Sequence, residues 1–215
     1  MRDGPDSHGP DSDGPERDGT TPLGVVLCGG ASSRMGADKA LLGAPGEPLA
    51  GVVARALRDG GCRSVVLVGG DEHRLRSIDA PWLPDAVAGE GPLGGIAAVV
   101  AAHPGTALVV CACDLPWIEG RDLRPLLSSL AAGAAVAVFD LDGVPQWSAA
   151  ALSAEAAAAA LDSFRSGERS LHAALGARTA GAGGDLRILR AERAAALRDV
   201  DRPEDLPRSW SSSRG

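Results

Sequence analysis

The sequence contains little of what several classes of protein require. Aromatic residues make up only 3% of its 215 residues, so the hydrophobic core must be built mainly from Ala, Val and Leu. The apolar runs are too short for a membrane-spanning helix, and the polar N-terminus is unlike a signal peptide. The formal net charge of -7 has the wrong sign for a basic face that binds nucleic acid. We therefore expect a cytoplasmic protein with no membrane and no nucleic-acid polymer among its partners.

Cysteine is also scarce, and its spacing does not predict a metal site. The thiols are at Cys28, Cys62, Cys111 and Cys113. Cys111 and Cys113 alternate within an apolar run, so a strand would place both on one face. Two cysteines separated by a single residue are too close for a zinc knuckle, and no second pair completes one. We expect buried, reduced thiols.

Composition divides the chain into one domain and two tails. Residues 1–21 are rich in Asp, Gly, Pro and Ser, and the first 22 residues carry six acidic and two basic side chains. Such a segment buries too little apolar surface to fold, so we expect a disordered acidic tail over 1–21. The domain then spans 22–208, and residues 209–215 form a loose C-terminal tail.

Apolar segments of two kinds alternate through the domain. Short apolar runs predict strands, and stretches with helical spacing predict helices. Strands separated by helices are typical of an α/β fold with a mainly parallel sheet covered on both faces. The predicted strands are 23–27, 64–68, 107–111, 134–139 and 146–152, and the predicted helices are 49–57, a short one near 71, 91–102, 121–130, 153–161 and one from 166.

The stretch Leu23–Leu42 carries the strongest functional signal. Its apolar start ends in Gly29 and Gly30, and Arg34 and Lys39 follow. A glycine-rich loop after a strand presents backbone N–H groups to an anion, and the two positive charges suit a triphosphate. Lys39 is the only lysine among 21 basic residues. Its compact ammonium fits between phosphate oxygens, although a lysine left by chance in an arginine-rich sequence is the alternative.

This loop is neither a Walker loop nor a dinucleotide fingerprint, but it resembles a third signature. The pattern L-x-G-G-x-S-x-R-M-G-x-D-K is that of the molybdenum cofactor guanylyltransferases, a MobA-like family of the nucleotidyltransferase superfamily. The resemblance implies a Rossmann-like three-layer α/β/α fold, with Arg34 and Lys39 as catalytic residues. The nucleotide-binding residues that it implies here are Leu27, Cys28, Gly29, Gly30 and Lys39.

An acidic residue, Asp114, directly follows the apolar run that contains Cys111 and Cys113. A carboxylate there is costly unless it binds a cation, and Mg²⁺ takes one or two carboxylates together with phosphate oxygens and water. An Asp that caps a turn is the alternative. The C-x-C-D-x-P pattern resembles the family's metal-binding motif, which implies that Asp114 is catalytic, binds the nucleotide and holds Mg²⁺.

Two further segments resemble family motifs. Asp85, followed by G-P-L-G-G, resembles a second loop, and this implies nucleotide contacts from Asp85, Gly91, Pro92 and Leu93. A carboxylate can accept from guanine's N1–H and 2-amino group or from ribose hydroxyls, and the sequence leaves that choice open. Near the C-terminus, D-x-D-R-P-E-D-L resembles the family's N-x-N-T-P-E-D-L. Asp201 is therefore either a second Mg²⁺ ligand or a helix cap.

Residues 139–195 resemble the family least. The segments G-V-P-Q-W at 143–147 and G-E-R-S at 167–170 are similar to family segments that would form the pterin-binding surface. On this resemblance Arg169 is a candidate for binding the phosphate of the pterin.

Taken as a whole, the resemblance implies transfer of GMP from GTP to molybdopterin or its molybdenum form, with release of pyrophosphate. It also implies molybdoenzymes or cofactor-insertion proteins as partners. A cytidylyltransferase for the same cofactor and another small NTP transferase, such as a sugar-nucleotide pyrophosphorylase, are alternatives; the G-G and G-P-L motifs favour guanine. A nucleotide-binding protein without chemistry is a third alternative, which Lys39 and Asp114 disfavour.

Overall fold

The computed structural model describes residues 21–29, 40, 42–44, 47–87, 89–176, 185–200, 205–206 and 210. Most of the two expected tails lies outside the described residues, as do Gly30, Arg34, Lys39 and Asp201. Within the described ranges, none of the helices combines the length and the apolar character needed to cross a membrane.

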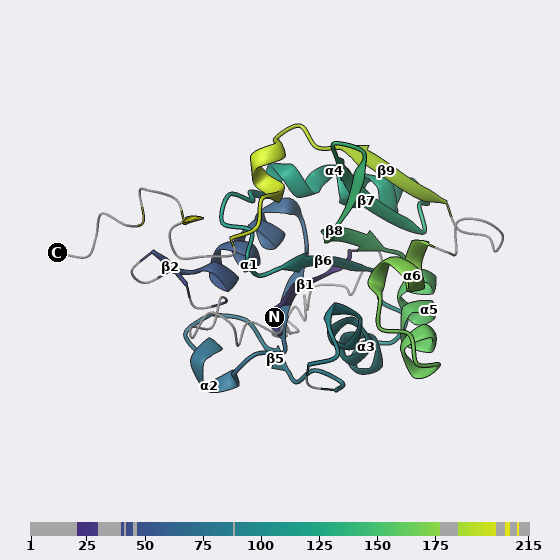
Figure 1. The fold of residues 1–215 in the computed structure, drawn as a ribbon, viewed down its shortest axis with the longest axis horizontal. Helices are drawn as coiled ribbons and strands as arrows, with labels where there is room; N and C mark the ends of the chain where they lie inside the picture. Colours follow the sequence, from purple (N-terminus) through teal and green to yellow (C-terminus); the bar gives the residue numbers. More distant parts are fainter. Residues whose placement is uncertain are drawn as a thin grey trace, which may run out of the picture.

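A seven-stranded sheet forms the middle layer of the molecule (Figure 1). The strands of the structure are β1 Leu23–Leu27, β2 Gly43–Ala44, β3 Glu47–Pro48, β4 Ser64–Val68, β5 Trp82–Leu83, β6 Leu108–Ala112, β7 Val136–Leu141, β8 Val144–Leu152 and β9 Leu186–Arg190. Their order in the sheet is β5-β4-β1-β6-β8-β7-β9, while β2 and β3 pair separately. Only β8 runs against the other strands of this sheet. The predicted mainly parallel sheet is confirmed.

Helices cover both faces of this sheet. They are α1 Leu49–Gly60, α2 Glu72–Leu75, α3 Pro92–Ala102, α4 Gly120–Ala131, α5 Ala154–Arg165, α6 Leu171–Gly176 and the short 3-10 helix η4 Ala194–Leu197. Helices α1 and α4 pack together on one face, and α3, α5 and α6 pack on the other (Figure 1). Along β1, Val26 joins the core under α1, whereas Val25 and Leu27 join the core under α3. This alternation is the two-residue period of a strand that is buried on both faces.

Several ends of these elements follow from single residues. The hydroxyl of Ser153 accepts a hydrogen bond from Ala156 N at 3.2 Å, so Ser153 is the N-cap of α5, at the start of the helix predicted over 153–161. Helix α1 ends at Gly61, whose φ of 119° is a conformation that glycine adopts without strain.

Other elements differ from the predictions. The helix expected from Ser166 begins at Leu171, because the Ser170 hydroxyl caps it by accepting from Ala173 N. Strands β7 and β8 form an antiparallel hairpin that turns at Asp142 and Gly143, with φ of 53° and 83°. Strands β2, β3, β5 and β9 were not predicted.

The cysteines confirm the expected buried thiols. None of the four forms a disulfide within the described ranges, and all lie in the core on the α1 face of the sheet. Burial raises the pKa of Cys62 to about 12. Burial, with a contribution from nearby Cys62, also raises the pKa of Cys111. The thiols of Cys62 and Cys111 therefore stay protonated near neutral pH.

Candidate functional site

Four neighbouring parallel strands have their carboxyl ends side by side, and the residues that follow these ends form the candidate site. Gly29 comes after β1, Gly69 after β4, Asp85 after β5 and Asp114 after β6. The carboxyl ends of parallel strands are where α/β proteins bind ligands. Residues separated by up to 85 positions in the sequence are thus brought to one edge, as the order of strands requires.

Backbone hydrogen bonds continue past the strand ends and hold these residues in line. Each residue after a strand donates its N–H group to the last residue of a neighbouring strand. The pairs are Cys28 N to Val68 O at 2.8 Å, Gly69 N to Leu83 O at 2.9 Å and Cys113 N to Leu27 O at 3.1 Å. The predicted site residues Leu27 and Cys28 are therefore fixed by the sheet itself.

The carboxylate of Asp85 lies among glycines. A Cβ atom placed on Gly29 would lie 2.5 Å from Asp85 Oδ2, and one on Gly69 would lie 2.6 Å from the same oxygen. On Gly95, in α3, a Cβ would lie 3.3 Å from Asp85 Oδ1. Side-chain carbons do not approach other atoms this closely, so a side chain at residue 29 or 69 would displace the Asp85 carboxylate. The structure brings together the predicted residues Gly29 and Asp85, and it adds Gly69 and Gly95.

Asp85 has neither a hydrogen bond nor an ion pair with any residue in the described part of the chain. Burial raises the pKa of this carboxyl above its ordinary value. The residue also lines a groove of about 370 Å³ between the loop after β5, α3 and α5. A partly buried carboxylate without donors is a site for the N–H or O–H groups of a ligand.

Asp114 occupies the neighbouring strand end, beyond β6. Its backbone carbonyl accepts from Val200 N at 3.0 Å, so the chain that leads to Asp201 passes beside it. The described ranges contain no group of three or more His, Cys, Asp or Glu residues suited to a metal. A cation at Asp114 would therefore take oxygen atoms from the substrate or from residues outside those ranges, which suits Mg²⁺.

Gly91, Pro92 and Leu93 form the entrance to α3. Gly91 has a φ of 80° and precedes the helix, and Pro92 occupies its first position, where a missing N–H group costs nothing. The side chain of Leu93 is fully buried in the core. Any contact between Leu93 and a nucleotide would therefore involve its backbone.

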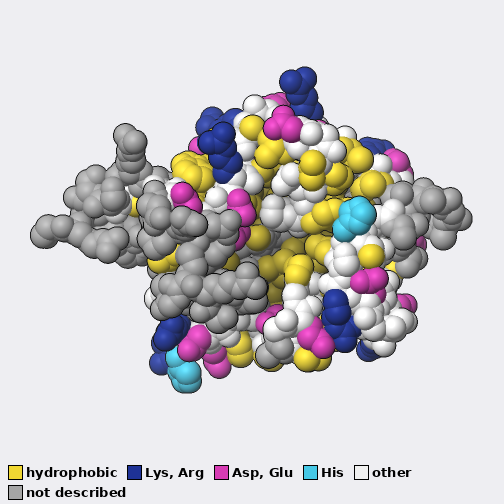
Figure 2. Space-filling view, viewed as in Figure 1, with side chains coloured by type: hydrophobic (Ala, Val, Ile, Leu, Met, Phe, Trp, Pro, Cys, Tyr) yellow, Lys and Arg dark blue, Asp and Glu magenta, His cyan; other side chains and the backbone are white. Residues whose placement is uncertain are grey.

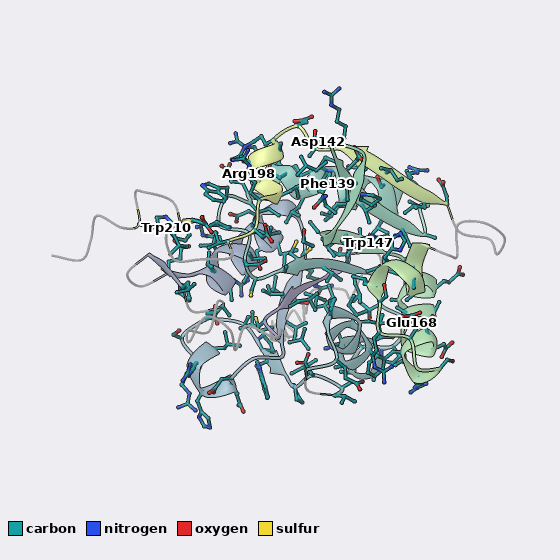
Figure 3. The ribbon with its side chains drawn as sticks, in the orientation of Figure 1. Phe139, Asp142, Trp147, Glu168, Arg198 and Trp210 are labelled. Carbon is teal, nitrogen blue, oxygen red and sulfur yellow. The ribbon has the colours of Figure 1, made fainter. Side chains whose placement is uncertain are left out.

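The segment expected to bind the pterin forms the β7–β8 turn and the start of β8. Its last residue, Trp147, lies beside α6 (Figure 3), where its ring meets His172 edge-on with centroids 5.9 Å apart. On the same view of the molecule, hydrophobic side chains gather in a hollow near the centre, with charged side chains around it (Figure 2). His172 itself is exposed, and this ring contact is with Trp147.

Gly69 and the ion pair of Arg169 with Glu90 were not predicted from the sequence. A signal for Gly69 was present, since Gly69 and Gly70 directly follow a predicted strand, as Gly29 and Gly30 do. No local signal connects Glu90 with Arg169, because the two residues are far apart in the sequence and meet only through the packing of α3 against α5.

Comparisons with known proteins agree with this geometry. Residues 24–181 match the family model described as the MobA-like NTP transferase domain. A probable molybdenum cofactor guanylyltransferase of Opitutus terrae is 36% identical over 151 residues, which cover 69% of this chain and 74% of that protein.

Solved structures share the fold at lower identity. Molybdopterin-guanine dinucleotide biosynthesis protein A from Archaeoglobus fulgidus superposes with a TM-score of 0.68 at 21% identity, covering 88% of this chain and 97% of that one. A Mycobacterium tuberculosis protein, solved in complex with manganese, gives a TM-score of 0.65 at 20% identity, covering 89% and 100%. The predicted nucleotidyltransferase type of α/β/α fold is thereby confirmed.

Proposed function

Because this chain belongs to the MobA-like NTP transferase domain family, we propose that it transfers GMP from GTP to the terminal phosphate of molybdopterin or its molybdenum form. The family makes it a nucleotidyltransferase, and the similarity to a probable molybdenum cofactor guanylyltransferase supports this substrate pair. One structural observation carries the proposal: the carboxylate of Asp85, without a partner in the described part, lies beside Gly29 at the ligand-binding edge of the sheet.

In this reaction an oxygen of the pterin's terminal phosphate attacks the α-phosphorus of GTP. A new bond forms between this oxygen and the α-phosphorus, which gives a phosphoanhydride; the bond from the α-phosphorus to the oxygen bridging to the β-phosphate breaks, and pyrophosphate leaves with that electron pair. The attacking phosphate is mostly ionised near neutral pH, since its second pKa is about 6. The chain therefore needs to position the reactants and stabilise negative charge, and it needs no general base.

Each part of the site has a place in this scheme. Asp85 accepts hydrogen bonds from guanine or from the ribose, and Gly29 lets the nucleotide approach the backbone closely. Lys39 and Arg34 contact the triphosphate; their roles rest on the sequence resemblance alone.

Asp114 and Asp201 are the proposed ligands of a divalent cation. The neighbour solved with manganese supports the use of such a cation. We propose Mg²⁺ because it prefers oxygen ligands such as these carboxylates. When bound, the cation supplies positive charge at the phosphate oxygens.

A pyrophosphate-release assay with molybdopterin tests the proposal, using GTP, CTP, ATP and UTP in parallel. We expect release with GTP, dependent on molybdopterin, and at least about tenfold tighter binding of GTP than of CTP, which is about 1.4 kcal/mol. A preference for CTP would move the assignment to the cytidylyltransferase. Nucleotide binding without any pyrophosphate release would indicate a protein that binds nucleotides without chemistry.

Two finer points belong to the same proposal. We infer that the dinucleotide product passes to a molybdoenzyme or a cofactor-insertion protein, since the product is itself a cofactor. Its location in the cytoplasm stays a prediction from the sequence.

A further inference from the structure

Arg169 joins the turn between α5 and α6 to the loop in front of α3. Its guanidinium carbon lies 4.4 Å from the centroid of the Phe164 ring. Its Nη1 donates to Phe164 O at 3.0 Å and to Glu168 O at 2.8 Å, and its Nε lies 2.6 Å from Glu90 Oε2. One side chain thus contacts two parts of the chain that α3 and α5 place side by side.

The α5–α6 turn holds this arginine from its own side. The carboxylate of Glu168, which Figure 3 shows at this turn, accepts from Ser170 N at 2.7 Å and from Arg169 N at 2.8 Å. These two backbone hydrogen bonds lower the pKa of Glu168, so the carboxylate stays ionised at neutral pH. The backbone of Arg169 is therefore held by Glu168, independently of the contact between its side chain and Glu90.

The loop on the other side is rich in glycine. Glu90 stands between Gly89 and Gly91, whose φ values are 82° and 80°. A Cβ placed on Gly91 would lie 4.0 Å from Arg169 O, and one on Gly94 would lie 3.5 Å from the Phe164 ring. Glycines on both sides of Glu90 leave the loop many conformations, and the ion pair to Arg169 selects one of them.

The same contacts argue against Arg169 as an anion site for the pterin. Its guanidinium already faces a carboxylate at ion-pair distance and stacks on an aromatic ring. An incoming phosphate would have to compete with Glu90 for the same nitrogen atoms.

We propose that Arg169 is a positioning residue, which acts through Glu90 and Phe164 to hold residues 89–93 in the conformation that receives the nucleotide. The inference rests on the proposed function for the identity of that nucleotide, GTP. Arg169 does not touch the reacting atoms. Its removal therefore loosens the loop and weakens GTP binding, while the transfer step and the binding of molybdopterin stay as they are.

The test compares Arg169→Ala, Glu90→Ala, the double variant and Arg169→Lys. We expect each single alanine variant to raise the KM for GTP roughly twofold to fivefold, a range typical of a half-exposed ion pair. The KM for molybdopterin and kcat should change less than about twofold. The double variant should be no worse than either single one, because both remove the same interaction. Arg169→Lys keeps the charge but loses the planar stack, so it should recover part of the affinity.

Arg187→Ala is the matched control. Arg187 is also a partly exposed arginine in an ion pair, with Asp185 at 3.0 Å, and it also donates to a backbone carbonyl. It lies on β9, at the opposite edge of the sheet from β5. Its removal should leave the KM for GTP unchanged.

Amide hydrogen exchange of residues 89–95 is the second readout, measured without nucleotide. Faster exchange there in Arg169→Ala and Glu90→Ala, with the rest of the domain unchanged, supports the inference. Unchanged exchange in this segment overturns it, as does a raised KM for molybdopterin in place of GTP. A failure of the proposed function looks different: the wild-type protein would release no pyrophosphate from GTP, while loop exchange would still depend on Arg169 and Glu90.

Discussion

Replacing Asp85 by Asn is expected to make the protein more stable and at the same time to weaken its binding of GTP. Asn has the shape of Asp, so it fits into the same space beside Gly29 and Gly69. That space is narrow, since a Cβ atom on Gly29 or Gly69 would lie 2.5 or 2.6 Å from Asp85 Oδ2. The substitution removes a charge that has no partner in the described part of the chain. It also removes an acceptor that the ligand needs.

The gain in stability depends on pH with a definite sign. Burial raises the pKa of Asp85 in the folded protein above its unfolded value of about 3.9. Between those two pKa values the folded protein binds more protons than the unfolded chain, so stability falls as pH rises through this interval. The amide of the Asp85→Asn variant does not titrate. The advantage of this variant is therefore absent below about pH 3–4, grows through the interval and is complete once the pH exceeds the raised pKa.

The magnitudes follow from the partial burial of this carboxylate. A fully buried polar group without a partner costs about 1–3 kcal/mol, and a partly exposed one costs the lower value, about 1 kcal/mol. For a domain of this size that is a rise in Tm of about 2–4 °C. Hydrogen bonds to a charged acceptor contribute about 1.5–3 kcal/mol, so GTP should bind about tenfold to 150-fold more weakly.

Thermal melts at pH 7 and pH 4 and calorimetric titrations measure both effects. Titrations with inosine triphosphate, which lacks the 2-amino group, and with 2′-deoxy-GTP show whether Asp85 contacts the base or the ribose. Asp162→Asn, at an exposed carboxylate on α5, is the control and should change neither stability nor affinity. Wild-type affinity for GTP in Asp85→Asn, or a lower Tm at pH 7, would refute the reasoning.

Three further substitutions and one labelling experiment test other parts of the molecule. Gly29→Ala should weaken GTP binding at least about tenfold in a titration, because its Cβ would displace the Asp85 carboxylate. Asp114→Ala should lower pyrophosphate release by orders of magnitude and should keep the binding of GTP without metal, whereas normal turnover of this variant would place the cation elsewhere. Lys39→Ala should weaken the metal-free binding of GTP by about 1.5–3 kcal/mol. Cys62, with a pKa of about 12, should resist alkylation at pH 8 in the folded protein, and rapid labelling detected by mass spectrometry would contradict its burial.

The elements that could be predicted are those fixed by their own residues. Strands β1 and β4 match the predicted 23–27 and 64–68 residue for residue, since each is a short apolar run bounded by polar or small residues. Helix α3 starts within one residue of its prediction, because Gly91 and Pro92 mark its beginning. Local sequence decides these boundaries, and tertiary packing only confirms them.

The elements that could not be predicted depend on partners far away in the sequence. Strand β9 has the sequence Leu-Arg-Ile-Leu-Arg, which lacks a two-residue alternation, and it is partly exposed. It forms because it pairs in parallel with β7, an interaction invisible in its own sequence. The β7–β8 hairpin did have a local signal, since Asp-Gly is a common turn pair with positive φ. The predicted strands 134–139 and 146–152 left Asp142 and Gly143 in a longer connection, so this turn pair was not recognised.

The surroundings of Asp85 show why a motif alone could not describe the site. Gly69 must be glycine for two reasons, since its φ is 74° and a Cβ would meet the carboxylate. At Gly29 the approach to the carboxylate is the reason that the structure shows, and at Gly95 the closest approach is to Leu27, at 3.0 Å. A sequence shows that these residues are glycines but not what each one approaches. Alanine at 69 should therefore strain the backbone even when Asp85 is also replaced by Ala, whereas the same second change should relieve the clash caused by alanine at 29.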